Sequence, residues 1–146
     1  MGTLSGKLIS INLSSEKGVT KKPVQSAELI ADHGLEGDAH AGDWHRQVSL
    51  LAQRSIDKML AAGLDVGPGD FAENLTVDGF ELHTLPLGTR LRLGPALLEL
   101  TQIGKVCHAR CAIYEQAGDC VMPREGIFVK VLTSGTIKVG DTLELL

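Results

Sequence analysis

The sequence predicts a mainly β protein, a closed or partly open β-barrel with one main helix and a few short helical turns. The 17 glycines stand mostly between short runs rich in Val, Ile and Leu, which is the pattern of strands joined by tight turns. Many short strands with one helix favour a barrel, because closure removes exposed sheet edges. A length of 146 residues suits one domain, so residues 1–146 are interpreted as a single unit.

Strands and the main helix are expected in the first half of the chain. The apolar runs predict strands at residues 7–13, 24–30 and 47–52. A helix is expected over 53–62, because Ile56, Met59 and Leu60 fall on one helical face and Gly63 is suited to end it.

The second half is expected to consist of strands and turns. Further strands are predicted at residues 74–77, 89–93, 96–101, 127–131, 136–139 and 142–145. Gly94-Pro95, Ser134-Gly135 and Gly140-Asp141 are the predicted turns. The last three strands follow one another so closely that the tail is predicted to be a β meander.

Composition argues against several classes of protein. The net charge of −4 gives no basic footprint, so nucleic acid is not an expected partner. No apolar run is long enough to cross a bilayer, and the N-terminus lacks a charged start followed by an apolar stretch, so a cytoplasmic protein without a membrane partner is expected. Three cysteines, an odd count, argue against a disulfide framework.

Cys107, in the segment GKVCHARC, is the first candidate for chemistry. Lys105, His108 and Arg110 surround it, and positive neighbours lower the pKa of a thiol by favouring the thiolate. Such a thiolate can accept a persulfide sulfur or bind a soft metal. An idle free cysteine with solvated basic neighbours explains the same residues equally well.

Two further cysteines extend this segment. Cys111 and Cys120 follow Cys107 in the same polar stretch, and the three thiols with His108 or His40 have the ligand types of a zinc site. There is no second C-x2-C pair, so ordinary core or surface cysteines remain the other interpretation.

Three other polar segments are candidates for ligand contacts. GLEGDAHAGDWH contains Asp38 and His40 among glycines, and such carboxylates and imidazoles can bind a metal, orient a ligand or exchange protons, or simply form a solvated loop. In GDFAENL, Asp70 and Glu73 have capping-box spacing beside Asn74. Arg124 precedes a strand and suits an anionic group, or lies free on the surface.

The order of GLEGDAHAG, QVSLL, GDFAENL, LPLGTRLRLG and a cysteine after a β segment resembles the MOSC domain. This module occurs at the C-terminus of molybdenum-cofactor sulfurases and as free-standing bacterial proteins. The resemblance covers roughly residues 5–146. Its most specific parts are Gly37-Asp38 with His40, Glu73-Asn74, and Cys107.

The resemblance implies a barrel of the pyruvate-kinase-barrel type and a functional cysteine that carries sulfur or meets molybdenum. Carried over, that cysteine is Cys107. Val106 stands where the commoner pattern has proline. The C-terminal part is similar to a subgroup with extra Cys and His residues, which leaves open whether Cys107, Cys111 or Cys120 acts.

A sulfur-carrier or cofactor-binding domain of molybdenum metabolism is therefore the predicted function. Its expected partners are a sulfur donor such as a cysteine desulfurase, molybdenum-cofactor biosynthesis proteins or molybdoenzymes. Pyridoxal phosphate and autonomous desulfurase activity are not expected. Extraction of sulfur from free cysteine needs a pyridoxal-phosphate Schiff base in a large separate domain, for which the chain has no room. A non-catalytic molybdopterin delivery module and a zinc-stabilised interaction domain are the alternatives. The predicted cofactor contacts are Asp38, His40, Asn74, Lys105, His108 and Arg124.

Overall fold

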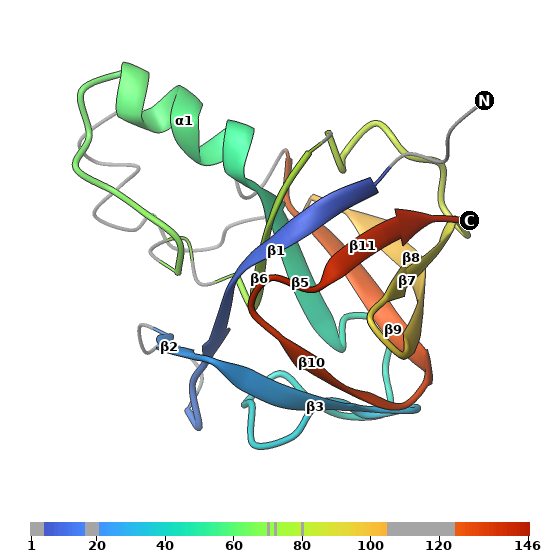
Figure 1. Ribbon diagram of the computed structural model, residues 1–146. Coiled ribbons are helices and arrows are strands. Elements are labelled where there is room, and N and C mark those ends of the chain that lie inside the picture. The colour runs from blue at the N-terminus through green and yellow to red at the C-terminus, as the bar shows by residue number, and fades with distance from the viewer. Residues whose placement is uncertain (1–4, 17–20, 70, 72, 80, 105–124) are drawn as a thin grey trace.

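A closed barrel of seven strands forms the centre of the computed structural model (Figure 1), which describes residues 5–16, 21–69, 71, 73–79, 81–104 and 125–146. Around the barrel the strand order is β11 (Thr142–Leu145), β7 (Arg90–Leu93), β8 (Ala96–Ile103), β9 (Ile127–Thr133), β5 (Val48–Ala52), β6 (Leu75–Asp78) and β1 (Ser5–Leu13). Antiparallel pairing of β1 with β11 closes the ring. The predicted fold class is confirmed.

β5 is buried along its whole length because both of its faces are covered. Val48, Leu50 and Ala52 point into the barrel core. Leu51 points outward and packs in a second cluster beneath the helix, with Ile56, Met59, Phe71 and Phe128. The helix α1 (Gln53–Ala61) thus covers one outer face of the barrel, as Figure 1 shows.

The helix begins and ends close to the predicted bounds. Gly63, with a φ of 95°, follows its last turn, and its N–H donates to the carbonyl of Leu60 at 3.0 Å. Ile56 and Met59 face the barrel as predicted, whereas Leu60 is 43% exposed. Within the described ranges no helix is long and apolar enough to span a membrane.

A second, three-stranded sheet corrects two predictions. The strand predicted over 24–30 is divided into β2 (Lys22–Val24), which pairs with β1, and β3 (Ser26–Ile30). β3 pairs with β4 (Gly34–Leu35) on one side and with β10 (Gly135–Lys138) on the other. Figure 1 shows β10 and β3 side by side below the barrel.

The predicted C-terminal meander is therefore wrong. β10 does not return along β9, and β11 pairs with β7 and β1 rather than with β10. Gly135 begins β10 instead of lying in a turn. A Cβ at this position would lie 2.6 Å from Cγ of Pro95. The absent side chain thus lets the chain pass close to the β7–β8 turn and reach β3.

Candidate functional site

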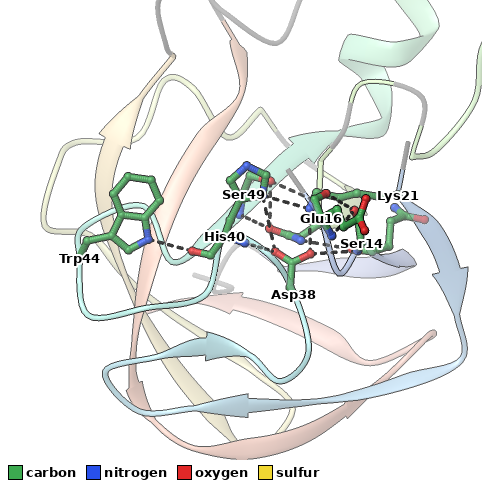
Figure 2. A network of polar contacts seen from close by, with 9 residues as sticks. Ser14, Glu16, Lys21, Asp38, His40, Trp44 and Ser49 are labelled. Carbon is green, nitrogen blue, oxygen red and sulfur yellow. Dashed lines mark hydrogen bonds and ion pairs between the residues drawn. The ribbon is translucent and has the colours of Figure 1, made fainter. Parts of the chain in front are cut away.

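A buried carboxylate organises the loop between β4 and β5. Asp38 Oδ1 accepts hydrogen bonds from the backbone N–H of Ser14 at 3.1 Å and from Lys21 Nζ at 2.8 Å, while Oδ2 accepts from the N–H of His40 at 3.1 Å. Figure 2 shows these groups around Asp38. The carbonyl of Ser14 also accepts from the N–H of Ala39 at 2.7 Å. The loop is thus fastened to the end of β1.

Asp38 is held in its charged form by these contacts. Burial alone raises the pKa of a carboxyl group, but the hydrogen bonds around Asp38 and the charge of Lys21 outweigh it and hold the pKa of Asp38 well below its usual range. The side chains of Asp38 and Lys21 are 0% and 1% exposed. Their ion pair is therefore buried on both sides.

His40 extends this pair to the surface. Its Nδ1 lies 3.1 Å from Lys21 Nζ, and its side chain is 36% exposed. Asp38 and His40 stand out in the sequence, whereas Lys21 does not, because nothing in the sequence distinguishes it from its exposed neighbour Lys22. Asp38 and His40 meet directly through the His40 N–H, with Nδ1 at 3.7 Å from Asp38 Oδ2, and Lys21 contacts both side chains.

The second half of the loop reaches the outer face of β8 and β9. Trp44 Nε1 donates to the carbonyl of His40 at 2.8 Å. The Arg46 guanidinium lies 4.6 Å from the Trp44 ring centroid and 5.7 Å from that of Phe128. His45 Nε2 lies 2.8 Å from Gln102 Oε1. The loop therefore joins the Asp38 network to the end of β8.

Gly104 follows β8 and Gly126 precedes β9, so these two glycines bracket the cysteine-containing segment in the sequence. Gly104 N–H donates to the carbonyl of Gly126 at 2.6 Å, next to the last ladder pair, Ile103 and Ile127. Gln102 Nε2 donates to the carbonyl of Gly104 at 2.8 Å. The predicted site residues Lys105, Cys107, His108, Cys111, Cys120 and Arg124 lie between these ends and outside the described residues.

Glu125 fixes the far end of that segment to the helix. Its carboxylate accepts from Ser55 Oγ at 2.7 Å and from Lys58 Nζ at 2.9 Å. Burial opposes ionisation of Glu125, but the hydrogen bonds from Ser55 and Lys58 outweigh it and lower the pKa. The two ends are therefore held between α1 on one side and the His45 loop on the other.

Asn74, predicted to contact a cofactor, makes internal contacts in the described structure. Its Oδ1 accepts from the N–H of Ser49 at 3.0 Å and from Ser49 Oγ at 3.2 Å, and its Nδ2 donates to the carbonyl of Asn12 at 3.2 Å. The side chain thus ties β6 to β5 and β1. Its proposed role toward a cofactor stays a prediction.

Glu73 is a buried acid beside Asn74. Its Oε2 accepts from Gly69 N–H at 3.0 Å and from Thr76 Oγ1 at 2.8 Å, whereas among the described residues Oε1 has no hydrogen-bond partner. Burial raises the pKa of Glu73 despite those two donors. Asp70, the other residue of the predicted capping box, lies outside the described residues. Among the residues that the structure describes, no group of three or more His, Cys, Asp or Glu is arranged to hold a metal.

Most of the chain matches the model of one protein family. The model of the MOSC domain matches residues 37–144. The chain belongs to the MOSC domain family. This family is related to the C-terminal domains of molybdenum-cofactor sulfurases, as the resemblance of the sequence motifs implied.

Several solved structures share the fold of this chain over nearly its whole length. The YuaD protein from Bacillus subtilis has a TM-score of 0.82 at 18% identity, with 99% of this chain and 97% of that chain covered. YiiM from Geobacillus stearothermophilus has a TM-score of 0.72 at 21% identity, covering 97% and 75%. YiiM from Escherichia coli has a TM-score of 0.64 at 22% identity, covering 96% and 69%. These similarities concern the fold of the MOSC domain. No curated protein matched the chain.

Proposed function

We propose that this MOSC domain acts in molybdenum-cofactor metabolism as a sulfur carrier or cofactor-binding domain, with Cys107 as the acting thiol. The observation that carries the proposal is the match of the chain to the MOSC domain, together with the pairing of Gly104 and Gly126, the described residues that flank the segment of Cys107 in the sequence. A rigid barrel end with polar side chains around it is a usual setting for a functional loop. We expect the protein to work in the cytoplasm, where thiols stay reduced.

The described residues fit an anionic cofactor better than a bare metal ion. Arg46 Nε is buried and has no hydrogen-bond partner in the described part of the chain, and the guanidinium stacks over Trp44. A phosphate or pterin oxygen that contacts the guanidinium would give this cation an anionic partner. The molybdenum cofactor, when bound, supplies a soft metal centre for which a Cys107 thiolate is a suitable ligand. Lys105, His108 and Arg124 are the proposed cationic contacts from the same segment.

The loop between β4 and β5, which carries Asp38 and His40, would position the residues that contact the ligand. Asp38 already accepts hydrogen bonds at both oxygens, so we assign it a positioning role toward Lys21 and His40 and not a direct contact with the cofactor. Asn74 would act in the same indirect way, through the β1, β5 and β6 backbone that it joins.

The sulfur-carrier reaction is a thiol exchange. The Cys107 thiolate attacks the outer sulfur of a donor persulfide and forms a new sulfur–sulfur bond with it. The bond between the donor's two sulfurs breaks, and the inner sulfur leaves with the donor as a thiolate. The atoms and electrons balance without another reagent. Cationic neighbours favour the thiolate form that attacks.

Mass spectrometry after incubation with a cysteine desulfurase and free cysteine tests the sulfur-carrier function. We expect wild-type protein to gain one sulfur atom at Cys107 and Cys107→Ser to gain none there. Cys111→Ser and Cys120→Ser are matched controls that should react as wild type does. Equal behaviour of wild type and Cys107→Ser, with no adduct on Cys107, contradicts this function.

The two alternatives give different results in the same preparations. A delivery module without sulfur chemistry would contain a pterin, detected by its fluorescence after oxidation, and would form no persulfide. A zinc-stabilised interaction domain that uses Cys107, Cys111, Cys120 and a histidine would contain one equivalent of zinc and would unfold when a chelator removes it.

A further inference from the structure

The contact between Lys21 and His40 determines which ring nitrogen carries the proton. A lysine ammonium has three donors and no acceptor. At 3.1 Å from Lys21 Nζ, His40 Nδ1 must therefore accept. In a neutral imidazole one nitrogen accepts and the other donates, so the proton lies on Nε2.

Burial makes this arrangement hard to reverse. A proton on Nδ1 would face the ammonium of Lys21, whose side chain is 1% exposed. The nearest carboxylate oxygen that could accept this proton, Asp38 Oδ2, lies 3.7 Å from Nδ1, which is beyond hydrogen-bond distance. Lys21 cannot turn away easily, because its ammonium is also 2.8 Å from Asp38 Oδ1. Asp38 is itself fixed by Ser14 and by the N–H of His40. These contacts thus hold the Lys21 ammonium next to His40 Nδ1.

We propose that His40 serves the site as a hydrogen-bond donor through Nε2, held in this tautomer by Lys21, and contacts an oxygen of an anionic ligand instead of binding a metal ion. Binding of a metal through Nε2 requires a lone pair on that nitrogen, which this tautomer does not have. The partly exposed ring can still offer its N–H to a ligand oxygen.

An anionic oxygen is the acceptor that the surroundings favour. Asp38 is neutralised by Lys21, so the charge of this buried carboxylate does not repel a ligand. The ammonium that bonds to Nδ1 draws electrons from the ring and strengthens the Nε2–H donor. The carbonyl of His40 is bonded to Trp44, on whose ring the Arg46 guanidinium lies. The loop therefore presents a cation as well as the N–H.

This inference rests on the proposed function only for the identity of the ligand, since the tautomer stands on the Lys21 contact itself. Long-range proton–nitrogen NMR at about pH 8, where histidine is ordinarily neutral, reads the tautomer directly. We expect the His40 signals, assigned by their loss in His40→Gln, to show a protonated Nε2 in wild type. Lys21→Arg keeps a donor and should keep this pattern. A protonated Nδ1 in wild type overturns the proposal without any variant.

Ligand class is tested with inorganic phosphate and Zn²⁺ as separate probes. Phosphate should shift the Nε2–H signal of wild type. His40→Gln retains an N–H at a similar distance and should bind phosphate within a few-fold of wild type, whereas His40→Leu should bind it about tenfold more weakly or worse. An Nε2 shift typical of zinc coordination, or equal phosphate binding by the Leu and Gln variants, overturns the proposal. Persulfide formation on Cys107 is measured independently, so failure of either proposal is recognised without the other.

Discussion

Replacing Lys21 with methionine removes the positive half of the buried ion pair while keeping most of the hydrocarbon stem. Asp38 would retain its bonds to the N–H groups of Ser14 and His40 but lose the charge 2.8 Å from Oδ1. Removing one partner of a buried pair destabilises a protein by about 3–5 kcal/mol. With a urea dependence of about 2 kcal/mol per molar, the unfolding midpoint should fall by about 2 M.

The loss of stability in Lys21→Met should depend on pH. In wild type the depressed pKa of Asp38 stabilises the fold above the usual carboxyl pKa of 3.8, and this contribution is lost as pH falls below that value. Without Lys21, burial dominates and raises the pKa of Asp38, so the folded variant takes up a proton as pH falls from neutrality. The stability difference between Lys21→Met and wild type should therefore narrow from pH 7 toward pH 4.

Lys58→Met is the matched control. Lys58 forms the same kind of pair with Glu125 at 2.9 Å, but its side chain is 53% exposed, so its loss should change the free energy of unfolding by less than about 1 kcal/mol. The double variant Lys21→Met/Asp38→Asn, which leaves no buried charge, should recover part of the loss. Equal losses at Lys21 and Lys58, or a deficit that is the same at pH 7 and pH 4, would refute the reasoning.

Three further substitutions test other parts of the structure by urea or thermal unfolding. Because burial raises the pKa of Glu73, wild type loses stability as pH rises above the usual value of 4.5; Glu73→Gln should avoid this loss and gain on wild type between pH 5 and pH 8. Asn74→Ala leaves the buried N–H of Ser49 without its side-chain acceptor and should destabilise by about 2 kcal/mol. Gly79 has a φ of 137° and its Cβ position lies 2.7 Å from the Cα of Gly6, so Gly79→Ala should destabilise by about 1–3 kcal/mol.

Local patterns were sufficient to predict most strands and the helix. The alternation of Arg90 and Arg92 with buried Leu91 and Leu93 is visible in the sequence, and Gly94, with a φ of 54°, marks the turn that follows. Pairing partners are a different matter, because they depend on residues far apart in the chain. Nothing near β10 in the sequence indicates that it joins β3 and not β9.

Only part of the candidate site could be predicted, because its contacts also join residues that lie far apart in the chain. Asp38 and His40 stand out in the sequence as polar residues among glycines, and the structure places both in contact with Lys21; their role as site residues stays a prediction. Lys21 could not be selected, since its burial follows from how β1 and β2 bring it against Asp38. A single sequence offers no local sign of such a contact. The prediction for Cys107 depends on the family resemblance and on charge, and the experiments above are its test.

The seam that closes the barrel also sets how the protein folds. Ser5 pairs with Glu144, so the ring cannot close until strands from opposite ends of the sequence meet. Contacts of such long sequence separation must overcome a large loop-closure entropy, and they make folding slow compared with helical proteins of this size. During synthesis β1 is made long before β11, so the edge of the sheet where β11 pairs stays uncovered until the last strand is made. Until then the open sheet exposes an unpaired strand edge, which makes the nascent chain prone to aggregation.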